Sequence, residues 1–122
     1  MNDYLYYIGL IVIIGIYFYR KIKKSKKASQ MIDSGSIIID VRTPQEFKSG
    51  HYPNSISIPL DTLKNNLDKI KDYKNGIVVV CASGMRSGQA KSILSNNGIE
   101  SFNGGSWKNL LLLNVLRPQG QN

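Results

Sequence analysis

The only cysteine of the chain, Cys81, lies where ionised thiol chemistry is favoured. It follows the apolar run Ile77–Val80, which predicts a buried strand, and it precedes a predicted helix over Ser87–Asn97. In an α/β sheet, ligands bind beyond the carboxyl ends of the strands, which is where this cysteine falls. The small residues between strand and helix let backbone N–H groups converge on an anion, and Arg86 adds a full positive charge. Together these features predict a lowered Cys81 pKa and a nucleophilic thiolate.

A lone cysteine has a second interpretation, because many such residues at strand ends are small buried hydrophobes. The placement of Gly84 and Arg86 before a helix start favours the reactive alternative. One Cys and one His exclude an internal disulfide framework and a cluster of Cys and His ligands. We therefore expect neither a metal nor a cofactor.

Short alternating elements are expected to position the Cys81 loop. Apolar runs predict strands over Ser36–Val41, Ser55–Ile58, Ile77–Val80 and Ile99–Phe102. Helices are predicted at Gln30–Ser34, from Thr43 to Gly50, along the apolar face Leu60, Leu63, Leu67 and Ile70, over Ser87–Asn97, and over Trp107–Leu116. Thr43 and Glu46 form the pattern of a capping box, and Gly104-Gly105 reads as a turn. This alternation predicts an α/β fold with a mostly parallel sheet and helices on both faces.

The N-terminus has the pattern of a membrane anchor. Tyr4–Tyr19 is an uncharged apolar run with aromatic residues at both ends, and the strongly basic segment Arg20–Lys27 follows it. As a helix the run would reach about 24 Å, slightly short of a ~30 Å hydrocarbon core, and snorkelling basic residues would close the gap. Positive charge marks the cytoplasmic side, so we expect a single-pass anchor with the N-terminus outside and residues 20–122 inside. A buried core helix and a cleaved signal peptide are the alternatives.

The distribution of charge separates this anchor from the rest of the chain. The chain of 122 residues has 16 Lys+Arg, 8 Asp+Glu and a net charge of +8, and six of the bases lie in Arg20–Lys27. These bases abut the apolar run and have no interleaved aromatic residues, so contact with anionic lipid is favoured over nucleic-acid binding. We expect a lipid bilayer as partner of residues 4–19, and no nucleic acid. The expected division is 1–27 for the anchor and basic segment, 28–117 for the α/β domain, and 118–122 for a polar tail.

Four motifs in one order give a specific resemblance. Cys81–Ser87 resembles the Cys-x-x-Gly-x-Arg-Ser loop of the rhodanese family, and Asp40–Phe47 is similar to its Asp-Val-Arg signature. Gly50–Pro59 is similar to its Gly-His stretch, and Gly104–Trp107 resembles its closing Gly-Gly and Trp element. The resemblance covers about residues 29 to 112. Tyr52, Asn54 and Ser55 depart from the family pattern, so Asn54 has to adopt the positive φ that glycine usually takes there. Trp107 follows the glycine pair sooner than is usual, which leaves the register of the last helix open.

The resemblance implies a sulfurtransferase with a rhodanese-like three-layer domain. Cys81 would take a sulfur atom from a small anionic donor such as thiosulfate, or from a protein persulfide, and pass it to a thiol or cyanide. A binding loop for the persulfide is implied at Ala82, Ser83, Gly84, Met85, Arg86 and Ser87. Arg86 is expected to stabilise the loop or the donor. Arg42 is a candidate second anion contact, although an ion pair with Asp40 or Glu46 is favoured, and a catalytic role of His51 stays open.

Two rival functions remain. A phosphatase of related fold has one more residue between Cys and Arg, whereas four residues separate Cys81 from Arg86 here. A non-catalytic protein-interaction module at the membrane is the other alternative, and the intact cysteine loop disfavours it. The sequence identifies neither the physiological donor and acceptor nor the oligomeric state.

Overall fold

Four parallel strands form the centre of the molecule. They are β1 (Ile37–Asp40), β2 (Ile56–Ser57), β3 (Ile77–Cys81) and β4 (Phe102–Ser106). The order across the sheet is β2-β1-β3-β4, and every neighbouring pair is parallel. This computed structural model describes residues 3–116, so the expected tail over residues 118–122 lies outside the described residues. Because β3 is an inner strand, Cys81 at its carboxyl end lies between β1 and β4.

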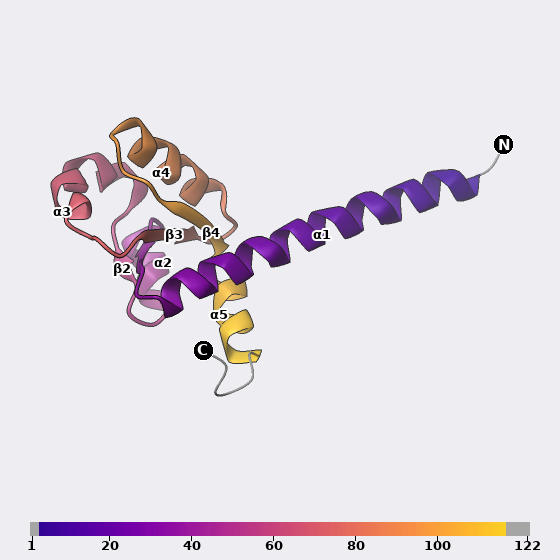
Figure 1. Cartoon of the computed structure of the whole chain (residues 1–122), viewed down its shortest axis with the longest axis horizontal. Helices are drawn as coiled ribbons and strands as arrows, with labels where there is room; N and C mark the ends of the chain where they lie inside the picture. The colour runs from indigo at the N-terminus through magenta and orange to yellow at the C-terminus, as the bar shows by residue number, and fades with distance from the viewer. Residues whose placement is uncertain (1–2, 117–122) are drawn as a thin grey trace.

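Helices cover both faces of this sheet (Figure 1). One face carries α1 (Asp3–Asp33) and α5 (Trp107–Leu116). The other carries the 3-10 helix η1 (Leu60–Asn66), α3 (Leu67–Lys71) and α4 (Met85–Asn96). The short α2 (Pro44–Ser49) follows β1. The expected α/β architecture with a parallel sheet between helical layers is confirmed.

The buried residues of the central strands alternate between the two faces, as the period of a strand requires. Ile39, Val79 and Cys81 belong to the cluster under α4. Ile38, Val78 and Val80 belong to the cluster under α1 and α5. Both clusters are apolar, so β3 is buried along its whole length, as its continuous run of apolar residues predicted.

α1 is one continuous helix of 31 residues. The separate helix expected over Gln30–Ser34 is wrong, because the chain from Arg20 to Gln30 contains good helix formers and no Gly or Pro to interrupt it. Gly35, with φ +100°, ends the helix. Its N–H donates to Ile32 O and the Ser36 N–H donates to Met31 O, which is a Schellman motif. The boundary expected between residues 27 and 28 therefore falls inside a helix.

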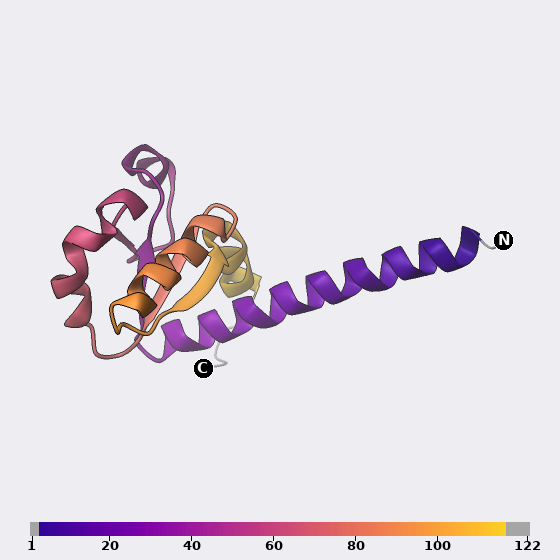
Figure 2. The same ribbon diagram turned by 90° about the horizontal axis from the view of Figure 1, so that it is seen from above.

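The two ends of α1 have different surroundings. Ala28 is fully buried against the sheet, whereas the N-terminal part projects away from the α/β body (Figure 2). The most apolar stretch of α1 has a mean hydropathy of 1.5, and none of it is buried inside the described structure. By length and composition this helix is a candidate membrane span, although a core helix or a signal sequence can pass the same test.

The last strand begins at Phe102, three residues later than expected. Ile99 was predicted to start it, but its N–H donates to Leu94 O at 2.9 Å and the Gly98 N–H donates to Ser95 O at 3.1 Å. These bonds close α4 in a second Schellman motif, and the apolar Ile99 is buried under the helix end instead of pairing in the sheet.

The glycine pair Gly104-Gly105 lies within β4, so the turn expected there is wrong. A Cβ on Gly104 would lie 2.7 Å from Val78 Cγ1, so only glycine lets this strand approach β3. Gly105 has φ +77° and coincides with a shift of register opposite Val79 and Val80. A β-bulge with glycine in this conformation re-aims the strand, and Trp107 follows at the start of α5.

Other local predictions are confirmed or shifted slightly. The capping box of Thr43 and Glu46 is present at the start of α2. Asn54 has φ +66°, the only described non-glycine residue with a positive φ. The helix predicted along Leu60 to Ile70 is a 3-10 helix followed by a short α-helix, and α4 begins at Met85, two residues early.

Candidate active site

The turn between β3 and α4 wraps around the sulfur of Cys81. The Gly84 N–H donates to Sγ at 2.9 Å and the Ser87 N–H donates to Sγ at 3.4 Å. Gly84 has φ +104°, and a Cβ placed on it would lie 3.3 Å from the Gly105 Cα. Glycine at this position therefore lets the loop close against β4 while its N–H points at the sulfur.

The remaining loop residues form the rim of this turn. Ala82 and Ser83 are exposed, and Met85 is 77% exposed. Cys81 itself is fully buried. The thiol therefore lies beneath this exposed rim.

Electrostatics at Cys81 favour the thiolate. Burial raises the pKa of the thiol, but hydrogen bonding with the Ser87 side chain and with the backbone of Ser87, Gly84 and Ser83 lowers it. The hydrogen bonds outweigh burial, and the net pKa lies below the ordinary value of a cysteine. This direction agrees with the expectation from the sequence and is typical of a reactive cysteine.

Asn103 of β4 is a site residue that the sequence does not single out. Its Oδ1 accepts hydrogen bonds from Ser87 Oγ at 2.6 Å and from the Gly105 N–H at 2.9 Å. Its Nδ2 donates to Gly84 O at 3.1 Å. Ser87 Oγ in turn lies 3.4 Å from Cys81 Sγ. Asn103 therefore positions both residues that contact the sulfur, and its place directly before the glycine pair is the only signal in the sequence.

Arg86 makes a two-pronged ion pair with Glu46 of α2. The distances are 2.7 Å from Nη1 to Oε1 and 3.0 Å from Nη2 to Oε2. The pair ties the first turn of α4 to α2, so the guanidinium directs these two nitrogens at a carboxylate. Hydrogen bonding to Glu46 also raises the pKa of Arg86.

The Glu46–Arg86 pair predicts a pH-dependent contribution to stability. Hydrogen bonding to Arg86 lowers the pKa of Glu46 from 4.5 to about 2, against a smaller opposing effect of burial, and Thr43 adds further hydrogen bonds. A carboxyl with a depressed folded-state pKa stabilises the fold above its unfolded pKa and loses that contribution as the pH falls through the folded pKa. Glu46→Gln, which can keep the capping box, is expected to destabilise the full chain by about 0.5 kcal/mol at pH 7, because the pair is one-third exposed. In urea unfolding the difference from wild type should shrink between pH 4.5 and 2.

The control for this prediction is Glu100→Gln. Glu100 is exposed and has no ion-pair partner among residues 3–116. Glu100→Gln therefore removes the same charge as Glu46→Gln without breaking an ion pair. A Glu46→Gln effect that stays constant from pH 7 to pH 2 would contradict the assignment.

Arg42 and Asp40 form a second ion pair, and it is buried. Arg42 Nη2 lies 2.7 Å from Asp40 Oδ2, and the two side chains are 6% and 0% exposed. The same Nη2 donates to Gly50 O at 2.7 Å, and the guanidinium lies 4.8 Å from the centre of the Trp107 ring. Asp40 and Glu46 were the two partners considered for Arg42, and the structure shows the pair with Asp40. This pair braces the turn after α2 against α5.

His51 follows the end of α2, and its contacts are with that helix and not with the sulfur. Its ring stacks on Phe47 with centroids 3.8 Å apart, and its Nδ1 donates to Phe47 O at 2.8 Å. Both contacts are local, so the structure gives His51 the role of closing the end of α2. No contact recorded for His51 among the described residues involves Cys81.

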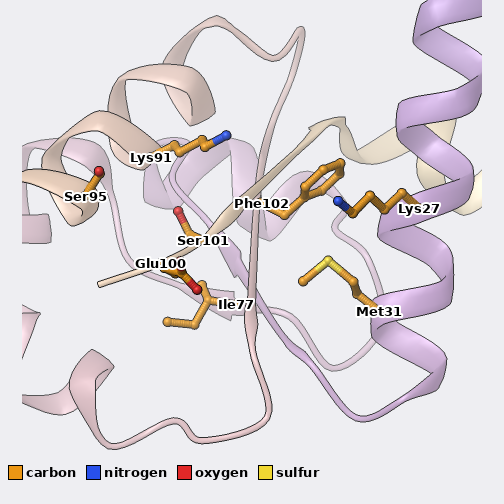
Figure 3. Close-up of a pocket in the computed structure, with 8 residues that line it drawn as sticks. All are labelled: Lys27, Met31, Ile77, Lys91, Ser95, Glu100, Ser101 and Phe102. Atoms are coloured by element: carbon orange, nitrogen blue, oxygen red, sulfur yellow. The ribbon is translucent and has the colours of Figure 1, made fainter. Parts of the chain in front are cut away.

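A separate pocket at the other end of β3 does not belong to this site. It has a volume of about 400 Å³ and is lined by Lys27, Met31, Ile77, Lys91, Ser95, Glu100, Ser101 and Phe102 (Figure 3). Ile77 is the first residue of β3, whereas Cys81 is the last, so the pocket and the cysteine loop share no residue.

Within residues 3–116, no group of three or more His, Cys, Asp or Glu side chains could hold a metal ion.

Comparisons with known proteins agree with this geometry. Curated relatives include a tRNA uridine(34) hydroxylase of Buchnera aphidicola, 30% identical over 83 residues, which cover 63% of this chain and 27% of that protein. The chain thus spans about a quarter of the length of the curated relatives it matches. Among solved structures, a rhodanese with anions from E. coli is 35% identical with a TM-score of 0.56, and covers 62% of this chain and 91% of that one. A rhodanese-like domain protein from Staphylococcus aureus is 32% identical with a TM-score of 0.54, covering 71% and 79%.

The family model described as Rhodanese-like domain matches residues 24–111. That range contains every strand of the sheet, the cysteine loop and the part of α1 that packs against the sheet. The chain therefore belongs to the rhodanese-like domain family.

Proposed function

We propose that this chain is a membrane-anchored sulfurtransferase that carries sulfane sulfur as a persulfide on Cys81. The observation that carries the proposal is the pair of backbone N–H groups, from Gly84 and Ser87, that point at Sγ from a closed loop. A persulfide is anionic at neutral pH, and preorganised N–H donors stabilise such a charge. The name of the E. coli relative, a rhodanese, supports the same chemistry. The hydroxylase relatives extend far beyond the matched region, so their named activity is not carried to this chain.

The reaction has two displacement steps. In the first, the Cys81 thiolate attacks the outer sulfur of a donor such as thiosulfate. A new S–S bond forms, the S–S bond of thiosulfate breaks, and its electron pair leaves with sulfite. In the second, an acceptor thiolate or cyanide attacks the outer sulfur of the persulfide, and the electron pair returns to Cys81 as thiolate. The Arg86 guanidinium forms an ion pair with the Glu46 carboxylate, so the role of Arg86 in both steps is to fix the loop.

The main test is intact mass spectrometry of the full chain in neutral detergent. We expect thiosulfate to add one sulfur atom to wild type, cyanide to remove it as thiocyanate, and Cys81→Ser to gain none. Absence of an adduct with thiosulfate and with a low-molecular-weight persulfide would contradict the proposal and favour the protein-interaction module. Turnover of an aryl phosphate that disappears in Cys81→Ser would favour the phosphatase, although a cradle with only four residues between Cys and Arg suits one sulfur atom better than phosphate.

The membrane anchor is part of this proposal. It is supported by the exposure of every residue from Tyr4 to Tyr19, which leaves an apolar helix surface with no cover in the described structure. The bases that follow support a cytoplasmic position of the α/β domain. Resistance of the full chain to alkaline carbonate extraction, with release by detergent, is the expected result. Recovery in the soluble fraction would contradict it.

A further inference from the structure

A pocket of about 450 Å³ connects the cysteine loop with the basic part of α1. One wall consists of Ser83 and Gly84 of the loop, with Asn103 and Gly105 of β4 beside them. The other wall is α1, through Ile13, Ile16, Tyr17, Arg20, Lys21 and Lys24. Gly84 is the residue whose N–H donates to Cys81 Sγ, so the pocket borders the loop that holds the sulfur.

The α1 wall is a single stripe along the helix. Its six members follow one another at alternating intervals of three and one residues, the spacing that places side chains on one helix face. The N-terminal half of the stripe is apolar, and the half nearer the α/β body carries three positive charges, on Arg20, Lys21 and Lys24. Among residues 3–116, none of these three has an ion-pair partner. The pocket is therefore positively charged beside the loop. Lys21 Nζ lies 5.9 Å from the centre of the Tyr17 ring, and no carboxylate within residues 3–116 neutralises the three cations.

We infer that Arg20, Lys21 and Lys24 form the anion-binding part of the sulfur-donor site, so that the N-terminal helix completes the active site. The inference rests on the proposed sulfurtransferase function and names its substrate class, a donor whose sulfur is bonded to an anionic group. When the thiolate attacks the outer sulfur of thiosulfate, sulfite leaves with the electron pair as a dianion. Cations beside the loop would bind the anionic group of the donor, and they would bind sulfite in the same way.

The basic segment provides its own control. Lys23 and Lys26 are exposed and do not line the pocket, and Lys27 lies over the Phe102 ring and lines the other pocket (Figure 3). The triple variant Arg20→Gln, Lys21→Gln and Lys24→Gln removes the same charge from the same helix as Lys23→Gln, Lys26→Gln and Lys27→Gln. Any difference between the two triples therefore comes from position and not from net charge.

The experiment measures thiosulfate turnover by the full chain in neutral detergent. The pocket triple is expected to raise the KM for thiosulfate roughly tenfold, the combined size of three exposed charge contacts, with kcat within twofold of wild type. The control triple should change KM by less than twofold. Equal KM values for the two triples would overturn the inference.

A second readout does not depend on sulfur transfer. Iodoacetate and iodoacetamide alkylate the same thiolate but differ by one negative charge, so their rate ratio at Cys81 reports anion binding next to the loop. The ratio is expected to fall several-fold in the pocket triple only, and an unchanged ratio would overturn the inference. If wild type formed no persulfide, the proposed function would fail while this ratio still decided whether the pocket binds anions.

A lipid phosphate could offer the pocket the same chemistry as a free sulfur oxyanion. Nanodiscs of phosphatidylcholine and of phosphatidylglycerol distinguish the two sources. If the donor occupies the pocket, phosphatidylglycerol should change the KM of wild type and of the pocket triple by the same factor. A rise in KM confined to wild type would show a headgroup in the pocket and would contradict the assignment to the donor.

Discussion

Gly84→Ala is expected to slow persulfide formation on Cys81 by roughly 100-fold, the usual effect of losing one preorganised N–H donor to a reacting anion. Gly84 has φ +104°, which an alanine side chain rarely adopts, and the new Cβ would lie 3.3 Å from the Gly105 Cα. That neighbour is backbone, so the loop has to move away from β4. The Gly84 N–H, 2.9 Å from Sγ, moves with it and the thiolate loses its shortest hydrogen bond. The rate of sulfur addition to the full chain, measured by mass spectrometry after mixing with thiosulfate, is the readout.

Gly98→Ala is the matched control for this variant. Gly98 has φ +76° at the far end of α4, and a Cβ there would meet nothing within 4 Å. The backbone strain is of the same kind, about 1 kcal/mol, without a change at the sulfur. Wild-type rates are expected for Gly98→Ala. A rate for Gly84→Ala within threefold of wild type would show that the loop tolerates displacement, and that its N–H groups do not control the reaction.

The Cys81 pKa provides an independent check on Gly84→Ala. Loss of a hydrogen bond to the thiolate raises the pKa of the thiol, so the pH profile for alkylation by iodoacetamide should move to higher pH. Gly98→Ala should leave the profile unchanged. A slower reaction with an unshifted profile would place the effect in donor access and not in thiolate stabilisation.

Local signals in the sequence predicted the parts of the fold that depend on neighbouring residues. The capping box of Thr43 and Glu46, the helix end at Gly98 and the positive φ of Asn54 each follow from a few adjacent residues, and each is present. The predicted start of β4 at Ile99 was wrong, because an apolar residue at this position can either pair in a strand or close the end of a helix. The glycine pair at 104 and 105 was read as a turn because its close approach to β3 is a property of the packed sheet.

The site was predictable only where one segment builds it. Cys81 and its loop are contiguous, so a strand end followed by small residues and a helix start was enough to locate them. Asn103 contacts Ser87, 16 positions away, and Arg86 contacts Glu46, 40 positions away. No periodicity in the sequence indicates such contacts. The cations of α1 are a stronger case. Their contact with anionic lipid was inferred from their neighbours in the chain and stays a prediction, whereas the fold shows that three of them also line a pocket beside the cysteine loop.

The two arginine–carboxylate pairs have similar geometry and very different expected stabilising effects. The Asp40–Arg42 pair is 0% and 6% exposed, whereas the Glu46–Arg86 pair is about one-third exposed, and both have a shortest distance of 2.7 Å. Solvent screens the exposed pair, so its contribution is at most about 1 kcal/mol. A buried pair is different because removal of one partner leaves the other charged and without compensation.

Arg42→Met is therefore expected to lower the free energy of unfolding by about 3 kcal/mol, near the lower end of the range for breaking a buried pair. Among residues 3–116, the Asp40 carboxylate would keep one hydrogen bond, from the Arg42 backbone N–H at 3.0 Å, and Gly50 O would lose the Arg42 donor. Urea unfolding of the full chain in neutral detergent measures the change. Arg86→Met, which removes the same side chain from the exposed pair, is the control and should cost about 1 kcal/mol or less.

The double variant Asp40→Asn with Arg42→Met separates charge from packing. If an unpaired buried carboxylate causes the loss, neutralising Asp40 should recover part of it, and the double variant should be more stable than Arg42→Met alone. If the loss comes instead from the contacts of Arg42 with Trp107 and Gly50, the double variant should be no more stable than the single one. The second outcome would assign Arg42 to the packing between the α2 turn and α5, and would leave Asp40 with no share in that effect.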